Sequence, residues 1–528
     1  MEALLKLDHV TICYNGEPVV QDINLELNKG EILGVVGESG SGKSTIIKAV
    51  MGLLGNEGMV TEGDIWYMGR NVVDMPEKEL RTLLGPEIAM VFQDSGAALC
   101  PIRTVGDQIY ESMREHEKIS SRECEERAIE MMEKIGLKDG RRVLRSYPFE
   151  LSGGMNQRVG ICISMLQHPS LLLADEPTSA LDVIVQKQVV EEMLLLRQEY
   201  HTAMIIVTHN IGVVGKMADK VLVLKNGKVM EYGDTRQVLD DPQDPYTKEL
   251  MNSVPRLNRG KLESICAGLN KEWREEVAEY ILEVRHLKKN FISGKKSFTA
   301  VEDVSFFLKQ GECLGIVGES GSGKSTVAKM ITHLTELTGG EIFLLGKNIT
   351  QVKGKELRET YREIQMVFQT PGESFDPRCT LGDGIGESLR NMGISKKETR
   401  KRVENLLIKY GLSADYADRY PHQVSGGECQ RAAIARALAV EPKILICDEA
   451  TSALDVTVQK QIMELLIKLK KEKNLAFIFI CHDLALVQMF CDRVIVMHDG
   501  QVEEEGTPEE IIERPKTEYT KRLIESVL

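Results

Sequence analysis

The sequence contains no uninterrupted apolar stretch of the roughly 18–20 residues that a membrane-spanning helix needs. Its first residues, Met1–Lys6, also lack the basic region and apolar run that mark a secretory signal peptide. We therefore expect a soluble, cytoplasmic protein. If this protein takes part in transport, other subunits must supply the path through the membrane.

Paired cysteines and excess positive charge are absent as well. The 11 cysteines are scattered without any C-x-x-C pair, and their odd number is typical of buried thiols in a reduced compartment. The formal net charge is -14, and an acidic chain is a poor general binder of nucleic acid or of anionic membrane surfaces. Local phosphate sites remain compatible with this charge.

The remaining composition is that of an ordinary globular protein. The chain has 528 residues, of which 42% are hydrophobic and 28% charged, so it can bury sizeable cores and long disordered regions are not expected. The length alone predicts two to four domains.

One unit is present twice. The string GESGSGKST occupies residues 37–45 and again 318–326, an offset of 281. Ser-Gly-Gly at 152–154 and 425–427 and Asp-Glu at 175–176 and 448–449 repeat at an offset of 273. Because the offset shrinks early and then stays fixed, we infer a duplicated domain with small loop deletions rather than coincidence.

Each half alternates strand-like and helix-like segments in the same order. Leu171–Ala174, Ala203–Val207 and their second-half counterparts are apolar throughout, which is typical of parallel strands covered by helices on both faces. Residues 104–146 and 381–417 are predicted to be helical insertions. We place the first domain at 1–244, an extension and linker at 245–280, and the second domain at 281–528.

The repeated glycine-rich string matches the P-loop pattern of nucleotide-binding proteins. Glycines let backbone N–H groups curl around phosphate oxygens, and the following helix directs its positive end at the same anion. We expect Lys43 and Lys324 to reach the β- and γ-phosphates of ATP. The hydroxyls of Ser44 and Ser325 are expected to ligate Mg²⁺.

Carboxylates at the ends of apolar strands complete the expected chemistry. Asp175 and Asp448 are predicted to contact Mg²⁺ through water, and Glu176 and Glu449 to polarise the attacking water. An isolated Asp-Glu pair can equally mark a strand leaving the core for solvent. The P-loop upstream and the second copy favour the catalytic interpretation.

Two further pairs lie at matching places in the halves. Gln93 and Gln369 each follow a short apolar strand, and their amides could ligate Mg²⁺ or hold water. His209 and His482 close apolar runs, and a neutral imidazole could contact a γ-phosphate. A single histidine at a strand end is more often structural, but both histidines lie 33 residues beyond their glutamate.

In this order, P-loop, glutamine, Ser-Gly-Gly, Asp-Glu and histidine resemble the ATP-binding-cassette (ABC) ATPases. Leu151–Arg158 and Val424–Arg431 are similar to the family signature, and Ser179–Asp182 and Ser452–Asp455 to its D-loop. The resemblance covers nearly the whole chain except the join. It implies an α/β fold of two tandem P-loop NTPase domains, each with a mainly parallel core sheet, an antiparallel β subdomain and a helical subdomain.

The resemblance also implies how the sites are built. The two domains would pack head to tail, so that Lys43 shares one ATP with Ser425 and Gly427, and Lys324 shares the other with Ser152 and Gly154. We predict two hydrolytically competent sites. The expected nucleotide-binding residues are Gly37, Ser39, Gly40, Gly42, Lys43, Ser44, Thr45, Gln93, Ser152, Gly154 and Asp182, with Gly318, Ser320, Gly321, Gly323, Lys324, Ser325, Thr326, Gln369, Ser425, Gly427 and Asp455.

The catalytic and metal assignments follow from the same resemblance. The expected catalytic residues are Glu176, His209, Glu449 and His482, and the expected Mg²⁺ site residues are Ser44, Gln93, Asp175, Ser325, Gln369 and Asp448. The resemblance places an aromatic near adenine, and Tyr14 and Phe291 are the candidates, although ordinary strand packing explains them nearly as well.

A narrower resemblance concerns the segment after the first domain. Asp244–Leu250 and Asn252–Leu257 resemble the tail of the peptide, opine and nickel importer ATPases, and Glu518–Leu523 echoes it. Some relatives carry a cysteine cluster there, but only Cys266 lies in this stretch, so no iron–sulfur centre is expected.

This resemblance predicts a peripheral motor at the cytoplasmic face of the plasma membrane. Its partners would be two permease subunits, contacted through residues 94–110 and 370–389, and an extracellular substrate-binding protein. Peptides, nickel or other metal chelates, and related small solutes all remain open as cargo. The main alternative is a soluble tandem-cassette ATPase acting on ribosomes or nucleic acid, which the short mixed-charge join and acidic total disfavour. A small-molecule kinase would have no use for two signatures.

Overall fold

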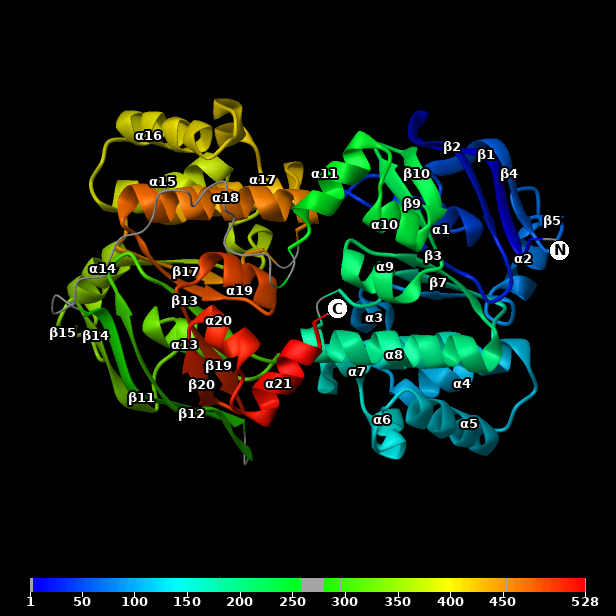
Figure 1. Ribbon diagram of the computed structural model, residues 1–528, viewed down its shortest axis with the longest axis horizontal. Coiled ribbons are helices and arrows are strands. Elements are labelled where there is room, and N and C mark those ends of the chain that lie inside the picture. Colours follow the sequence, from blue (N-terminus) through cyan, green and yellow to red (C-terminus); the bar gives the residue numbers. More distant parts are fainter. Residues whose placement is uncertain are drawn as a thin grey trace.

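The two halves of the chain lie side by side (Figure 1). The structure is a computed structural model that describes residues 3–179, 181–255, 257, 280–293, 296–451 and 454–527. In the view of Figure 1 the first half is on the right and the second half on the left. The C-terminus reaches the centre, between the halves.

The first half contains two sheets. The antiparallel sheet has the order β2-β1-β4-β5, and the central sheet the order β10-β9-β3-β8-β7-β6. In the central sheet β9, β3, β8, β7 and β6 run parallel, and β10 pairs antiparallel with β9. The strands are β1 (Leu5–Tyr14), β2 (Glu17–Leu27), β3 (Ile32–Gly37), β4 (Gly58–Tyr67), β5 (Arg70–Asn71), β6 (Ile88–Val91), β7 (Leu171–Asp175), β8 (Ala203–Val207), β9 (Lys220–Lys225) and β10 (Lys228–Asp234).

The second half repeats this order strand by strand. A single bridge from β12 to β20, Asp303 to Gln501, joins its two sheets into one, in the order β15-β14-β11-β12-β20-β19-β13-β18-β17-β16. The strands are β11 (Tyr280–Ser293), β12 (Lys296–Lys309), β13 (Cys313–Val317), β14 (Gly339–Leu344), β15 (Lys347–Asn348), β16 (Ile364–Val367), β17 (Ile444–Asp448), β18 (Ala476–Ile480), β19 (Arg493–His498) and β20 (Gln501–Gly506).

Helices flank the central sheets in matching places. Those of the first half are α1 (Lys43–Val50), α2 (Glu77–Leu83), α3 (Ser95–Ala98), α4 (Val105–His116), α5 (Ser121–Lys134), α6 (Gly140–Arg145), α7 (Gly153–Met165), α8 (Val183–Tyr200), α9 (Ile211–Met217), α10 (Thr235–Asp240) and α11 (Pro245–Ser253). Those of the second half are α13 (Lys324–Ile331), α14 (Gly354–Glu363), α15 (Leu381–Asn391), α16 (Lys396–Lys409), α17 (Gly426–Leu438), α18 (Val456–Lys473), α19 (Leu484–Phe490), α20 (Pro508–Glu513) and α21 (Glu518–Glu525).

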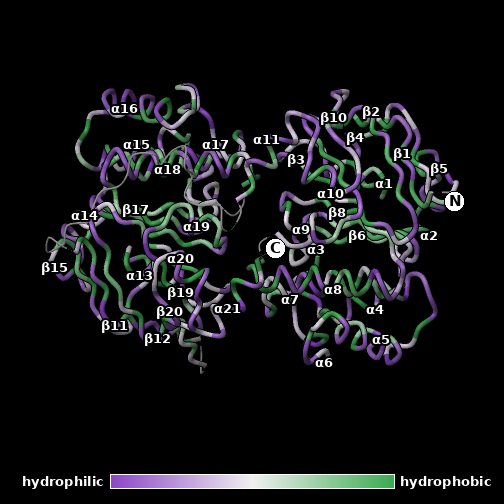
Figure 2. Tube along the Cα trace, viewed as in Figure 1, coloured by the Kyte–Doolittle hydropathy of each residue, from purple (hydrophilic) through white to green (hydrophobic). Residues whose placement is uncertain are grey.

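The burial of the central strands explains their sequence. Every residue of β7, β8, β17 and β18 is buried, as expected for parallel strands that are covered on both faces. Figure 2 shows that hydrophobic residues predominate along the central strands of both halves. The predicted insertions are helical, as α4–α6 and α15–α16. The prediction of a mixed α/β fold is therefore confirmed.

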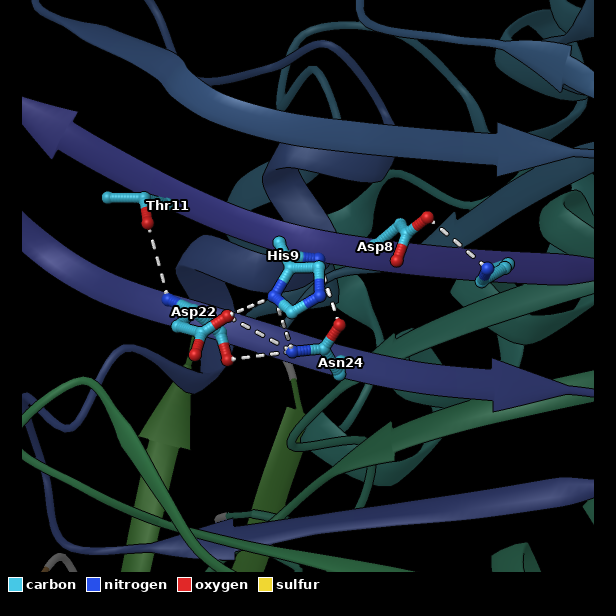
Figure 3. A network of polar contacts seen from close by, with 6 residues as sticks. Asp8, His9, Thr11, Asp22 and Asn24 are labelled. Atoms are coloured by element: carbon cyan, nitrogen blue, oxygen red, sulfur yellow. Dashed lines mark hydrogen bonds and ion pairs between the residues drawn. The ribbon is translucent and has the colours of Figure 1, made fainter.

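A polar network on the antiparallel sheet shows that even local irregularities were duplicated. The register of β1 and β2 shifts near His9, whose φ is 52° and whose Nδ1 lies 2.7 Å from Asp22 Oδ1. Figure 3 shows this exposed network on the two neighbouring strands, with Asn24 beside it. In the second half His286, with a φ of 49°, lies 3.0 Å from Asp303 Oδ1. We interpret both as polar caps on equivalent β-bulges.

Each half ends in a short helix that contacts the other half. Helix α11 packs against β10 and the N-terminal end of α18, where Val456 joins an apolar cluster with Tyr246 and Leu250. Helix α21 packs against α8, where Ile184 joins a cluster with Tyr519 and Leu523. Figure 1 shows both helices between the halves.

The domain boundaries at 244 and 280 stay predictions, since most of the predicted linker, including Cys266, lies outside the described residues. The cysteines that the structure describes are all free, and most are buried, with Cys379 exposed. Within the described ranges, no helix is both long and apolar enough to span a bilayer.

Candidate nucleotide-binding sites

The two P-loops connect a buried strand to a helix, as predicted. The first joins β3 to α1, and Gly42 caps the helix with a φ of 96° that favours glycine. Lys43 folds back onto its loop, donating to the carbonyl oxygens of Gly37 at 2.8 Å and Glu38 at 2.7 Å. Its second-half counterpart, Lys324, makes the same two contacts to Gly318 and Glu319.

Both loops need their first glycine for steric reasons. A Cβ atom on Gly37 would lie 2.1 Å from the carbonyl oxygen of Leu224, and one on Gly318 would lie 2.2 Å from that of Met497. The loops therefore pass too close to β9 and β19 for any side chain at these positions. The other predicted P-loop residues lie in the same loops and in the first turns of α1 and α13, namely Ser39, Gly40, Thr45, Ser320, Gly321, Gly323 and Thr326.

The predicted metal-binding serines and aspartates meet directly. Ser44 Oγ donates to Asp175 Oδ1 at 2.8 Å, and Ser325 Oγ donates to Asp448 Oδ1 at 2.8 Å. Burial raises the pKa of both aspartates above the usual range, and the serine hydrogen bonds only partly offset it. Oxygen donors of this kind fit Mg²⁺, which in nucleotide sites takes its remaining ligands from phosphates and water.

Glu176 lies at the centre of the first site. It follows β7 directly with a φ of 46°, a left-handed conformation that is uncommon outside glycine and is often found at functional sites. Gln93 Nε2 donates to its Oε2 at 3.3 Å, and His209 Nδ1 lies 3.2 Å from its Oε1. Burial opposes ionisation of Glu176, but the hydrogen bond and charge of His209 and the charge of Lys43 outweigh it and lower the pKa.

Glu449 repeats this arrangement with small differences. Its φ is 49°, and Gln369 Nε2 donates to its Oε2 at 2.7 Å. The second histidine is more distant, since His482 Nδ1 lies 4.0 Å from Glu449 Oε2. The glutamine, glutamate and histidine of each half thus gather at the carboxyl end of its central strands, as their order in the sequence predicted.

The signature serines cap helices. Ser152 Oγ accepts from the N–H of Met155 at 3.3 Å at the start of α7, and Ser425 Oγ accepts from the N–H of Glu428 at 3.4 Å at the start of α17. Each helix thus presents its positive end and bare glycine N–H groups beside an exposed hydroxyl. The sharing of ATP between a signature and the opposite P-loop stays a prediction.

The D-loop aspartates bring the two halves together. Asp182 caps α8 through Oδ1, which accepts from the N–H of Val185 at 2.9 Å. Its Oδ2 accepts from the N–H of Ser320, in the P-loop of the other half, at 3.1 Å. Asp455, the D-loop aspartate of the second half, is close enough to the first P-loop for its charge to act on Lys43. Burial lowers the pKa of Lys43, and the negative charges of Glu176 and Asp455 oppose this shift. Each aspartate therefore lies near the opposite P-loop.

The two aromatic residues expected near adenine lie on antiparallel strands, and their contact with adenine stays a prediction. Tyr14 ends β1, where its ring lies against Gly58, and Phe291 lies exposed near the end of β11. The tyrosines of the two tails, Tyr246 and Tyr519, were given no role by the motifs. Tyr519 accepts a hydrogen bond from the P-loop N–H of Glu319 at 2.9 Å. The repeated Tyr-Thr-Lys in both tails, at 246–248 and 519–521, was the available signal.

Two family models match the sequence. The family described as ABC transporter matches residues 20–179 and 301–452. The family described as oligopeptide/dipeptide transporter, C-terminal region, matches residues 230–272.

Curated relatives match along almost the whole chain. The glutathione import ATP-binding protein GsiA of Pectobacterium atrosepticum is 40% identical over 536 residues, covering 96% of this chain and 86% of the relative. GsiA of Escherichia coli strain K12 gives the same identity and coverage.

Among solved structures, a dimeric ATP-binding cassette in a post-hydrolysis state, bound to ADP and Pi, is 33% identical. That match covers 43% of this chain and 98% of the cassette, with a TM-score of 0.41. The two P-loops, their carboxylates and the matched family together establish that this chain belongs to the ABC transporter family, as an ATPase with two ATP-binding cassettes and an oligopeptide/dipeptide-type C-terminal region.

Proposed function

We propose that the chain hydrolyses ATP at two composite sites, each formed by the P-loop of one half and the signature and D-loop of the other. The observation that carries this proposal is the 3.1 Å hydrogen bond from Ser320 of the second P-loop to Asp182 of the first D-loop. A contact between the D-loop of one half and the P-loop of the other supports the proposed head-to-tail packing, in which each signature would face the opposite P-loop.

In each site the residues have distinct roles. Lys43 and Lys324 would leave their loop carbonyls to bind the β- and γ-phosphates. Ser44 and Asp175, with Gln93, would hold Mg²⁺, which neutralises phosphate charge; Ser325, Asp448 and Gln369 would do the same in the second site. These protein oxygens fill only part of the Mg²⁺ coordination sphere, and the nucleotide phosphates and water would supply the other ligands.

The glutamates would orient and polarise the attacking water. Glu176 is held by Gln93 and His209, so its carboxylate is ionised and fixed before ATP arrives. His209 would turn from Glu176 to the γ-phosphate when ATP binds and return to Glu176 when that phosphate leaves. Glu449 and His482 would act in the same way in the second site.

We further propose that hydrolysis powers the import of a small peptide-like solute. The support is the oligopeptide/dipeptide C-terminal region at 230–272 and the 40% identity to glutathione import ATPases. Nickel or other metal chelates, the other cargo expected from the sequence, have no such support from these relatives.

The motor would work at the cytoplasmic face of the plasma membrane with two permease subunits and an extracellular binding protein. Residues 94–110 and 370–389 follow the site glutamines and would contact the permeases. In the first of these segments Ile102 is 83% exposed, so its apolar side chain is available for a subunit contact.

The test is purification with membrane partners in detergent. The proposal predicts that permease proteins copurify, and that ATP turnover rises when a binding protein loaded with glutathione or a short peptide is added. A nickel chelate should stimulate less than the peptide. Sedimentation with ribosomes, without any membrane partner, would instead favour the soluble tandem-cassette alternative.

A further inference from the structure

The P-loop of the second half is held by two side chains from different places. The N–H of Ser320 donates to Asp182 of the opposite half at 3.1 Å. The preceding N–H, that of Glu319, donates to the hydroxyl of Tyr519 at 2.9 Å. Tyr519 belongs to α21, the tail helix of the same half, far beyond the loop in sequence. Two consecutive backbone donors of the phosphate loop are thus fixed from both sides of the interface.

The tail helix also contacts the helix that begins at Asp182. Ile184, on the first turn of α8, lies in one apolar cluster with Tyr519 and Leu523. At the other end of the tail helix, Lys187 Nζ donates to the backbone oxygen of Glu525 at 2.9 Å. The tail therefore connects the P-loop of its own half to the D-loop helix of the other.

The ring of Tyr519 is fixed by stacking. It lies on the imidazole of His498, with centroids 4.0 Å apart and an interplanar angle of 25°. His498 ends β19, the strand beside β13, which leads into the P-loop. Tyr519 is only 8% exposed, so its hydroxyl reaches the P-loop from a packed position.

The first half repeats the arrangement without the final hydrogen bond. Tyr246 on α11 packs under Lys225 Nζ, which lies 4.1 Å from the ring centroid at the end of β9. Its hydroxyl is buried near the backbone N–H of Glu38, the residue that corresponds to Glu319, in a weak contact that does not reach the distance and angle of a full hydrogen bond. Val456, next to Asp455, packs in the cluster around Tyr246.

We propose that Tyr519, and more weakly Tyr246, are positioning residues for the phosphate loops. Because each tail helix also contacts the opposite half, the affinity for ATP then depends on how the two halves pack together. The inference rests on the proposed ATP sites. A hydroxyl that accepts from the second residue of the loop fixes the orientation of the following N–H groups, which are the ones expected to surround phosphate. The tail thereby has a role in ATP binding.

The test isolates each loop by disabling the other. In a Lys43→Ala chain, equilibrium binding of ATP with Mg²⁺ reports the Lys324 loop. Adding Tyr519→Phe, which keeps the ring and its stacking, should weaken ATP binding by about fivefold, the effect of one hydrogen bond. Tyr246→Phe in a Lys324→Ala chain should have a smaller effect, because the contact of its hydroxyl with the backbone of Glu38 is weaker than that of Tyr519 with Glu319.

The matched control is Tyr232→Phe, which removes a hydroxyl of β10 that donates to the backbone oxygen of Glu26 in β2 at 3.1 Å and touches neither P-loop. It should leave ATP binding as in the parent chain. In steady-state hydrolysis by the full chain, the Tyr519→Phe loss should fall on the KM for ATP rather than on kcat.

Unchanged ATP affinity in Tyr519→Phe would overturn the inference, since a purely structural tyrosine is replaced by phenylalanine without such loss. If Lys43→Ala and Lys324→Ala each leave the number of bound ATP molecules unaltered, the proposed sites are wrong and the inference falls with them. The two failures are therefore distinguishable.

Discussion

Replacing the two site glutamates by glutamine separates chemistry from nucleotide binding. Glu176→Gln keeps the size of the side chain and an oxygen that can still accept from Gln93. It removes the negative charge that the hydrogen bond from His209 and the charge of Lys43 stabilise in a buried position. Loss of a group that polarises water costs about 10²–10⁴ in rate, or about 3–5 kcal/mol of transition-state stabilisation.

The double variant Glu176→Gln/Glu449→Gln should therefore lose about 10²–10⁴ in ATP turnover while still binding ATP. Each single variant should lose a large part of the turnover, because both halves carry the same glutamine-glutamate contact. The assay is phosphate release at saturating ATP and Mg²⁺, with a thermal melt to check folding. If one single substitution leaves turnover intact, the prediction of two active sites is wrong.

Three further predictions concern the charges around the sites. Burial raises the pKa of Asp175, so the ionised carboxylate lowers the free energy of unfolding at any pH above that pKa. Asp175→Asn should therefore raise the melting temperature at neutral pH without nucleotide. An unchanged or lower melting temperature would refute this. Removal of Mg²⁺ by chelation should abolish hydrolysis but not ATP binding, and hydrolysis in its absence would contradict the Ser44 and Asp175 assignment. Asp182→Asn should keep the cap of α8, and so the melting temperature, yet weaken ATP binding at the Lys324 loop of a Lys43→Ala chain, because the acceptor of the Ser320 N–H loses its charge; an unchanged affinity would refute a role for that charge.

Motif spacing predicted which residues of each half lie together, because these residues follow buried strands. Glu176 and His209 follow neighbouring parallel strands, so their order along the chain brings them to one edge of the sheet. The capping role of the signature serines was similarly accessible, because Ser-Gly-Gly before an apolar run begins a helix.

The remaining features depend on contacts between segments that lie far apart in the sequence. The Tyr519 hydroxyl meets Glu319 because the tail folds back across β19, and no periodicity in the sequence reports that path. Identical motifs also gave no indication that His482 lies 4.0 Å from its glutamate where His209 lies at 3.2 Å.

The sharing of ATP between the halves can be tested by counting bound nucleotides. Gly153 and Gly426 are useful positions, because a Cβ on either meets no atom within 4 Å, so an aspartate fits at the start of α7 or α17. Its charge suits a helix N-terminus but repels phosphate. The parent is Glu176→Gln/Glu449→Gln, in which ATP is not consumed and two molecules should bind.

Onto this parent, Lys43→Ala is combined with either aspartate, and ATP binding is measured by equilibrium dialysis. If each site is composite, Lys43→Ala with Gly426→Asp damages one site and leaves one bound ATP, whereas Lys43→Ala with Gly153→Asp damages both and leaves none. The reverse pattern, with one ATP retained only in the Gly153→Asp chain, would contradict the account by showing that each half binds ATP with its own signature.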